Sequence, residues 1–179
     1  MKLRILCLVW LLLAAGVFAQ VVKVKRVVDG DTFIAEETKT EYPVRLLFVD
    51  TPESVHPDIK QNHPMGKVAS NWTKKRIENT YVTLQTPVDS DEEDRFHRKL
   101  AIVFHGESCI NLELIQHGLS PYYTKFGKAP EPWHSKFANA EKQARDTKQG
   151  IWSDPELTKK YLRMKSKWGT KNPKKKKDR

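Results

Sequence analysis

Two acidic segments, one of them ending an apolar run, constrain this chain more than any other feature. The first has the sequence VVDGDTF (27–33), in which Asp29 and Asp31 flank a glycine. The second, VRLLFVDTPE (44–53), is an apolar run that contains a single arginine, Arg45, and ends in acidic and polar residues. An isolated charge is costly to bury without a partner. We therefore interpret the two segments as a divalent-metal site that faces a phosphate-binding arginine.

The first half of the domain predicts three consecutive strands. Residues 21–28 alternate in part with a period of two, and residues 32–35 resume the extended pattern after the turn dipeptide Asp29-Gly30. A polar patch over 36–41 predicts the next turn, and residues 44–49 predict a strand that is buried on both faces. Three strands in succession favour an antiparallel barrel over a parallel sheet.

The remaining elements complete a barrel pattern. Helices are expected over 65–79, over 112–117 with Asn111 as the N-cap, and over 133–148, and strands over 80–86 and 99–104. The predicted fold class is mainly β with α (α+β), a five-stranded OB-fold barrel with three helices. Such barrels commonly bind nucleic acids or sugars on one face, although the fold does not settle the function.

The N-terminus has the pattern of a secretory signal peptide. A basic start is followed by an apolar run over 5–13, and the small residue Ala19 ends the segment. We predict a signal peptide over 1–19, a domain over 20–155 and a basic, disordered tail over 156–179, helical only near its start if at all. The protein is then exported, either secreted or periplasmic, with no stable membrane association after cleavage and as a monomer. The alternative is a retained N-terminal anchor.

The charge of the chain points to an anionic partner. Loss of the signal removes Lys2 and Arg4 from a formal net charge of +10 and leaves +8. A small protein with this excess attracts polyanions, but charge alone does not separate nucleic acid from acidic lipid or polysaccharide. The lysines at 174–177 are expected to raise non-specific affinity for phosphate backbones, or else to act as a solubilising terminus.

Asp31 and Arg45 each have a simpler structural explanation. Asp31 and Asp50 can form an oxygen-ligand pocket for calcium, but Asp31 can also be a turn residue that satisfies its own backbone. The fork of Arg45 matches two phosphate oxygens. The alternative is a buried ion pair with Glu53 or Asp50, and both interpretations can hold when substrate is absent.

Five short motifs resemble those of the staphylococcal nuclease (thermonuclease) family. The strongest are VDGDT (28–32), RLLFVDTPE (45–53) and FHRKLA (96–101), and the weaker ones are QHGL (116–119) and GIWS (150–153). They occur in the family's order with nearly the same spacing, so the resemblance covers roughly residues 21–154.

The resemblance implies a reaction and a role for several residues. It implies calcium bound by Asp31, Asp50 and the backbone carbonyl of Thr51. It also implies Glu53 as the general base or the group that orients the attacking water. Arg45 and Arg98 would stabilise the charge that develops on the phosphate and on the departing oxygen. The implied substrates are DNA and RNA, and the implied products carry 3′-phosphate ends.

The chain departs from the family at substrate-binding positions. A Lys-Tyr pair and a glycine of the third motif are replaced by Arg95, Phe96 and His97. The charge is kept at Arg95, whereas a phenol hydroxyl is lost. Tyr122 and Tyr123 are the candidates for stacking on a base, with packing in a loop as the alternative.

Two other classes of protein compete with the leading interpretation. A catalytically inactive OB-fold module would bind nucleic acid without cleaving it, and a basic surface-binding protein would recognise anionic lipid or polysaccharide. The second leaves Asp31, Asp50 and Glu53 without a purpose. We favour an exported, calcium-dependent nuclease because every carboxylate and both arginines of the motifs are present.

Overall fold

A computed structural model describes residues 18–55, 57–88 and 90–168. The expected signal peptide lies almost wholly outside these ranges, as does the lysine-rich end of the chain. Six strands form one sheet: β1 (Phe18–Asp29), β2 (Thr32–Glu37), β3 (Thr40–Leu46), β4 (Tyr81–Thr86), β5 (Lys99–His105) and the two-residue β6 (Ser108–Cys109).

The sheet closes into a barrel through one parallel pairing. Neighbouring strands run in the order β3-β2-β1-β4-β5-β6, all antiparallel, and β3 also pairs with β5 in parallel register, Arg45 opposite Leu100. Closure over five strands removes the exposed sheet edges at β3 and β5. The predicted five-stranded OB-fold barrel is therefore confirmed.

The second hairpin differs from its prediction in both turn and strand. The turn occupies only Thr38 and Lys39, which both have positive φ (47° and 70°), so the strand begins at Thr40 and the chain leaves it after Leu46. Phe48, expected inside the strand, has a φ of 62°. Neither the Thr38-Lys39 turn nor the bend at Phe48 contains the Asn-Gly or Asp-Gly dipeptide that usually marks residues with positive φ. The shift matters because residues 47–53 become a loop at the barrel edge.

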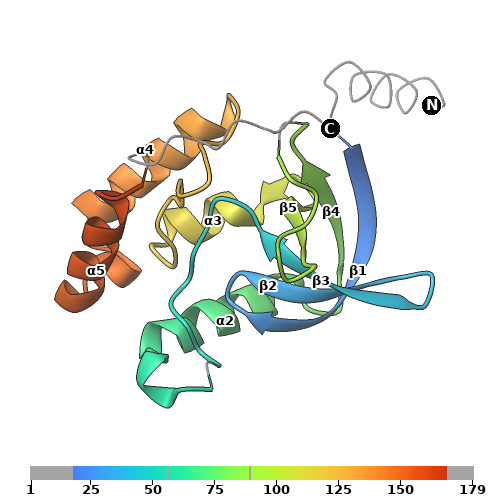
Figure 1. Ribbon diagram of the computed structural model, residues 1–179, viewed down its shortest axis with the longest axis horizontal. Helices are drawn as coiled ribbons and strands as arrows, with labels where there is room; N and C mark the ends of the chain where they lie inside the picture. Colours follow the sequence, from blue (N-terminus) through green and yellow to red (C-terminus); the bar gives the residue numbers. More distant parts are fainter. Residues whose placement is uncertain (1–17, 56, 89, 169–179) are drawn as a thin grey trace.

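The helices cover two sides of the barrel (Figure 1). α2 (Pro64–Ile77) packs against β1, whereas α3 (Ile110–Gln116) lies between the strands and α4 (Trp133–Asp146). These three confirm the three expected helices. Single 3₁₀ turns, η1 (Ile59–Gln61) and η2 (Gly150–Trp152), lie in the connections. None of the helices in the described ranges is long and apolar enough to cross a membrane.

A fourth helix lies where the disordered tail was expected to begin. α5 (Pro155–Lys165) is capped by Asp154, whose carboxylate accepts hydrogen bonds from the backbone of Glu156 and Leu157. Leu157 and Tyr161 of α5 are buried. Residues up to 165 thus pack on the domain, because an apolar pair at i, i+4 spacing gives this otherwise charged segment one core-facing side.

Asn111 does not cap α3 as the sequence predicts. It lies inside the helix, fully buried, and its amide joins β5 to the loop that follows β3. Its Oδ1 accepts from the Val103 backbone (2.8 Å), and its Nδ2 donates to the carbonyls of Leu47 (2.7 Å) and Ala101 (3.3 Å). The side chain therefore fixes the start of the 47–53 loop against the barrel.

Candidate functional site

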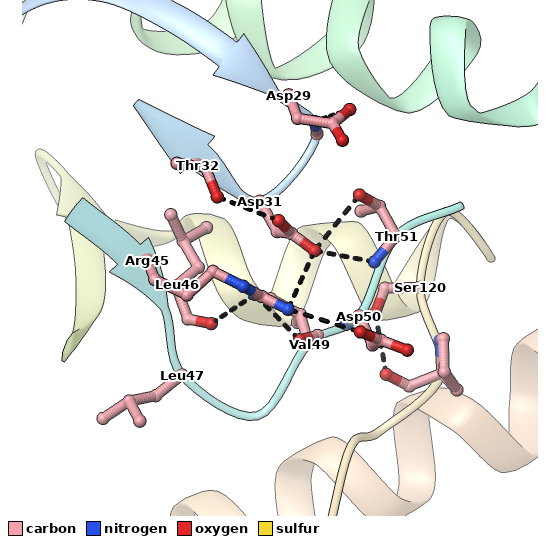
Figure 2. Close-up of polar contacts among 12 residues, drawn as sticks. Asp29, Asp31, Thr32, Arg45, Leu46, Leu47, Val49, Asp50, Thr51 and Ser120 are labelled. Carbon is pink, nitrogen blue, oxygen red and sulfur yellow. Dashed lines mark hydrogen bonds and ion pairs between the residues drawn. The ribbon is translucent and has the colours of Figure 1, made fainter. Parts of the chain in front are cut away.

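The guanidinium of Arg45 lies between two carboxylates at the edge of the barrel (Figure 2). Its Nη2 is 3.1 Å from Oδ2 of Asp31 and 3.4 Å from Oδ1 of Asp50. Its Nη1 donates to the carbonyls of Leu46 (2.9 Å) and Val49 (3.0 Å). The paired-charge explanation of Arg45 therefore holds in this state of the protein, with Asp50 as foreseen and with Asp31 in addition.

Asp31 lies at the centre of this cluster, and it is only 6% exposed. Besides the ion pair, its Oδ2 accepts from the backbone N–H (2.8 Å) and the hydroxyl (3.2 Å) of Thr51. Thr32 donates its hydroxyl to the other oxygen, Oδ1, at 3.2 Å. The carboxylate therefore joins the β1–β2 turn to the 47–53 loop, and it does not simply satisfy its own turn.

A close packing contact sets the height of the β1–β2 turn over helix α2. A Cβ on Gly30 would lie 2.8 Å from both the Cβ of Ala69 and the hydroxyl oxygen of Thr51. The hydroxyl of Thr73 also donates to the Gly30 carbonyl at 2.7 Å. Glycine is required here by this close approach, since its φ is not positive.

Asp50 is held by groups from two distant parts of the chain. Its backbone N–H donates to the hydroxyl of Ser120 (2.7 Å), which donates in turn to the Pro121 carbonyl (2.8 Å). The phenol of Tyr161 on α5 donates to the Asp50 carbonyl at 3.1 Å. Both sides of this backbone unit are therefore fixed, which limits how far the carboxylate can move.

The electrostatics of the cluster favour a cation. Burial, together with the negative charges of Asp31 and Glu53, raises the pKa of Asp50 to about 6 against the opposing charges of Arg45 and Lys160. Two carboxylates that face one guanidinium leave a surplus of negative charge in a partly desolvated place. A bound cation would relieve that surplus.

The oxygen donors fit calcium, although the protein supplies few of them. Within the described ranges, no three His, Cys, Asp or Glu side chains gather as metal ligands. Asp31 and Asp50 are the available carboxylates, and calcium accepts carbonyl and water oxygens for the rest of its shell. The site thus suits a hard cation that keeps water or takes substrate oxygens as ligands.

Asp29 ties the loop beyond Glu53 to the same hairpin. Its Oδ1 accepts from the hydroxyl of Ser54 (2.6 Å) and from the Gly30 backbone (2.8 Å). Burial raises the pKa of Asp29, and the hydrogen bond from Ser54 partly offsets this rise. Asp29 therefore holds Ser54 against the β1–β2 turn beside the cluster.

Glu53 extends into solvent from a fixed backbone. Its side chain is exposed, whereas its carbonyl accepts from the His63 backbone at 2.9 Å. A Cβ on Gly66 would lie 2.3 Å from this carbonyl, so the start of α2 presses directly on it. The Glu53 carboxylate is exposed, its backbone is held in place, and its charge raises the pKa of Asp50. A carboxylate in this position can align a water molecule.

Arg98 and Arg95 lie in the β4–β5 loop and are not joined to the cluster by a hydrogen bond. Arg98 binds Asp94 through Nε (2.8 Å) and Nη2 (2.6 Å). Arg95 is exposed, with its guanidinium 4.6 Å from the centre of the Phe96 ring. Arg98 directly precedes β5, whose residue Leu100 pairs with Arg45, so its backbone lies near the β3–β5 pairing.

The two tyrosines have different environments. Tyr122 is 3% exposed, its hydroxyl accepts from the Ala129 backbone, and it packs on Phe137, as the packing alternative proposes. Tyr123 is half-buried, and burial together with the charge of Asp50 raises its pKa to about 12. Tyr123 is therefore the member of the pair that lies beside the cluster.

Sequence reasoning missed three residues that position the site: Asn111, Ser120 and Tyr161. Each acts on the backbone of the 47–53 loop from more than sixty positions away in the chain. A buried amide or hydroxyl has no periodic signature, so nothing in the local sequence marks these contacts. For Tyr161 the sequence does hold one indication of burial, because it follows Leu157 by four residues, a helical spacing of apolar side chains inside an otherwise basic segment.

The fold and the site together define a class of protein, namely a closed OB-fold barrel whose edge carries an arginine between two carboxylates. Residues 43–154 match the family model described as "Staphylococcal nuclease homologue". The chain is 38% identical to the thermonuclease of Staphylococcus hyicus over 135 residues, which covers 75% of this chain and 77% of the relative.

Two further relatives agree with this match. The thermonuclease of Staphylococcus intermedius is 38% identical over 129 residues, covering 72% of this chain and 74% of the relative. The micrococcal nuclease of Shigella flexneri is 28% identical over 142 residues, with 74% of each chain covered. The chain belongs to the staphylococcal nuclease family.

Proposed function

We propose that this protein is an exported, calcium-dependent nuclease that hydrolyses phosphodiester bonds of DNA and RNA and leaves 3′-phosphate ends. The observation that carries the proposal is the Asp31–Arg45–Asp50 cluster at the edge of the barrel. Membership of the family supplies the substrate class, since the named relatives are nucleases.

Arg45 is the phosphate-binding residue of the proposed site. Its guanidinium pairs with Asp31 and Asp50 and offsets part of their charge, and a divalent cation held by the same carboxylates would take over that role. The Nη2 donors of Arg45 would then be free to bind a phosphate oxygen, while Nη1 stays on the carbonyls of Leu46 and Val49. This exchange gives a guanidinium that is oriented before substrate arrives.

Glu53 is the proposed general base or water-orienting group. It is the one acidic side chain of the 47–53 loop that stays exposed, and its backbone is held by His63 and Gly66. A carboxylate there can accept a hydrogen bond from water and aim it at phosphorus.

Arg98 is proposed to bind the phosphate and the departing 5′-oxygen. It directly precedes β5, the strand that pairs with β3, but Asp94 holds it through two nitrogens. Its role therefore requires that phosphate replace Asp94 as its partner, an exchange between two oxyanions that keeps the arginine neutralised throughout. Arg95 and Tyr123 are the proposed contacts to the rest of the substrate.

Calcium is the proposed cofactor, held by Asp31, Asp50 and the carbonyl of Thr51, with water completing its shell. When bound, it would act as a Lewis acid that stabilises charge on the phosphate. Export follows from the N-terminal pattern of residues 1–19, and the mature protein is proposed to be a monomer free of the membrane.

The test uses the mature chain, residues 20–179, with single-stranded DNA and with RNA, each in calcium, in magnesium and in chelator. The variant is Glu53→Gln, and Glu107→Gln, on the exposed β5–β6 turn, is the matched control. We expect calcium-dependent cleavage of both substrates, a loss of about a hundredfold or more in kcat for Glu53→Gln, and full activity for Glu107→Gln.

The ends of the products test the bond that breaks. Fragments with 3′-phosphates resist extension by a polymerase until a phosphatase has removed the phosphate. Binding of DNA without cleavage in any metal would refute the nuclease proposal and leave an OB-fold binding module. Equal losses for the two glutamate variants would refute the role of Glu53.

A further inference from the structure

Helix α5 presents a basic outer face, of which only Lys160 acts on the cluster described above, through its charge on Asp50. Lys159, Lys160 and Arg163 are exposed at i, i+1 and i+4 positions, so they lie on one side of the helix. Together with neighbouring side chains they line a hollow of about 470 Å³ on the surface of the domain. Its lining residues are Glu156, Lys159, Lys160, Arg163, Met164 and Lys167.

These three cations form no ion pair with any residue that the structure describes. Lys159, Lys160 and Arg163 contrast with Lys165, on the inner side of α5, which binds buried Glu141 at 2.8 Å and the Tyr122 carbonyl at 2.9 Å. Unpaired cations that repel one another on one helix face cost stability. A face of this kind is suited to an external polyanion.

The inner side of α5 fixes the helix rigidly against the domain. Leu157 and Tyr161 are buried, and Lys165 closes the last turn onto α4. Figure 1 shows α5 beside α4, outside the barrel. The outward direction of the basic face is therefore set by the packed inner face and is the same in every molecule.

Helix α5 is joined to the proposed active site through its inner side. Tyr161, in the middle of the helix and next in the chain to Lys160, donates to the Asp50 carbonyl at 3.1 Å. Beyond the C-terminal end of α5, the ring of Trp168 packs on Tyr123 at 4.8 Å between centres. These two contacts place α5 beside the carboxylate cluster.

We propose that the outer face of α5 binds the phosphate backbone of a nucleic-acid strand that extends beyond the cleavage site. This inference rests on the proposed function. The match to the family model spans residues 43–154, and α5 follows it in the chain.

The charge distribution gives the physical reason for such a surface. Asp31, Asp50 and Glu53 make the reaction centre acidic and repel a polyanion before cation is bound. Lys159, Lys160 and Arg163 would offset that repulsion and hold the flanking phosphates. From Lys159 to Arg163 the helix rises about 6 Å, which is comparable to the separation of about two successive phosphates along a strand.

The first experiment measures binding, in chelator, of a fluorescent 20-nucleotide single strand to the full mature chain over a range of salt concentrations. The variant Lys159→Gln/Arg163→Gln, which keeps Lys160 because its charge acts on Asp50, is compared with Lys39→Gln/Lys75→Gln, which removes two exposed cations from the β2–β3 turn and α2. Each phosphate contact with single strands adds about 0.7 to the slope of log K against log salt. We expect the α5 variant to lower the slope by about 1.4 and the control to leave it unchanged.

The second experiment measures cleavage in calcium of the same strand and of a dinucleotide. For the α5 variant we expect KM for the strand to rise about tenfold at low salt, with kcat unchanged and with both constants for the dinucleotide unchanged. A change with the dinucleotide would mean that α5 acts through the site and would overturn the proposal. An unchanged salt slope would also overturn it.

Two further outcomes separate the α5 proposal from the nuclease proposal and from lipid binding. If the parent protein cleaves nothing but the salt slope falls as expected, the nuclease function fails and the α5 surface stands. A parallel experiment measures how strongly the parent protein and the α5 variant bind to vesicles that contain anionic lipid. If the α5 variant loses vesicle binding but keeps its affinity for the strand, the surface recognises lipid and the nucleic-acid proposal is wrong.

Discussion

Replacement of Arg45 by methionine separates its structural role from its proposed chemical role. Methionine keeps much of the side-chain length and removes every donor. The Arg45 side chain is 14% exposed, and its partners Asp31 and Asp50 are 9% and 27% exposed. The variant leaves both carboxylates without their counter-charge and the carbonyls of Leu46 and Val49 without a donor from the side chain.

The size of the effect follows from this burial. Removal of one partner from a buried ion pair costs about 3–5 kcal/mol, because the remaining charge stays uncompensated. For a domain of this length the melting temperature should fall by roughly 10 °C in chelator. Calcium should then restore more stability to Arg45→Met than to the parent, because the cation replaces the missing charge. A cation at a hundred times its Kd adds about 2.7 kcal/mol.

The assay is urea and thermal unfolding of the mature protein, in chelator and in calcium. The matched control is Arg76→Met, which removes an arginine with two 2.9 Å contacts to Glu113 in a more exposed place. We expect a loss of at most about 1 kcal/mol there and no change in the response to calcium. Equal losses for the two variants, or an equal calcium response, would refute the account of Arg45 as the counter-charge of a cation site.

Three further predictions concern the groups around the cluster. Tyr161→Phe removes the hydrogen bond to the Asp50 carbonyl, worth about 1 kcal/mol, and should weaken calcium binding about fivefold by calorimetry while α5 stays folded by circular dichroism. Calcium affinity should also fall as the pH drops through about 6, because the raised pKa of Asp50 means that the folded apo protein holds a proton there which calcium must displace. Asn111→Ala leaves the Val103 N–H and the Leu47 carbonyl without their side-chain partners and should cost at least about 2 kcal/mol in urea unfolding.

Each of these predictions has an outcome that contradicts it. Unchanged calcium affinity in Tyr161→Phe would show that α5 does not hold the ligand loop. Calcium binding that releases no proton between pH 5 and 6 would show that Asp50 is ionised throughout, against its burial. For Asn111→Ala the control is Ser135→Ala, whose hydroxyl makes only an exposed contact with Glu131, and equal costs would mean that the buried amide does not anchor the loop.

The sequence alone determined the barrel and pointed to three residues that the structure brings together, Asp31, Arg45 and Asp50. Alternation of apolar residues defines strands locally, and the Asp29-Gly30 signal predicted the first hairpin, whose turn is Gly30-Asp31. The motif residues Asp31, Arg45 and Asp50 come together because the hairpin and the end of β3 lie side by side in the meander. Local pattern and neighbouring pairing were sufficient for these features.

Local pattern failed where positive φ occurs without glycine, at Thr38, Lys39 and Phe48. Strand pairing on both sides holds Thr38 and Lys39 in their turn, whereas Phe48 lies beyond β3 and its carbonyl accepts from the Tyr123 backbone at 2.8 Å. In both places contacts to other parts of the chain override the local preference. The predicted strand over 44–49 therefore ends too far along the chain and includes residues 47–49 of the loop that carries Asp50.

Only the tertiary structure decided which groups act on the site from a distance. Tyr161 reaches the Asp50 carbonyl across 111 positions of sequence, and Asn111 reaches the Leu47 carbonyl across 64. It also paired Arg98 with Asp94 and separated buried Tyr122 from Tyr123. A hydrogen bond depends on the positions of two atoms in space, and residues far apart in a chain acquire those positions only when the whole domain has packed.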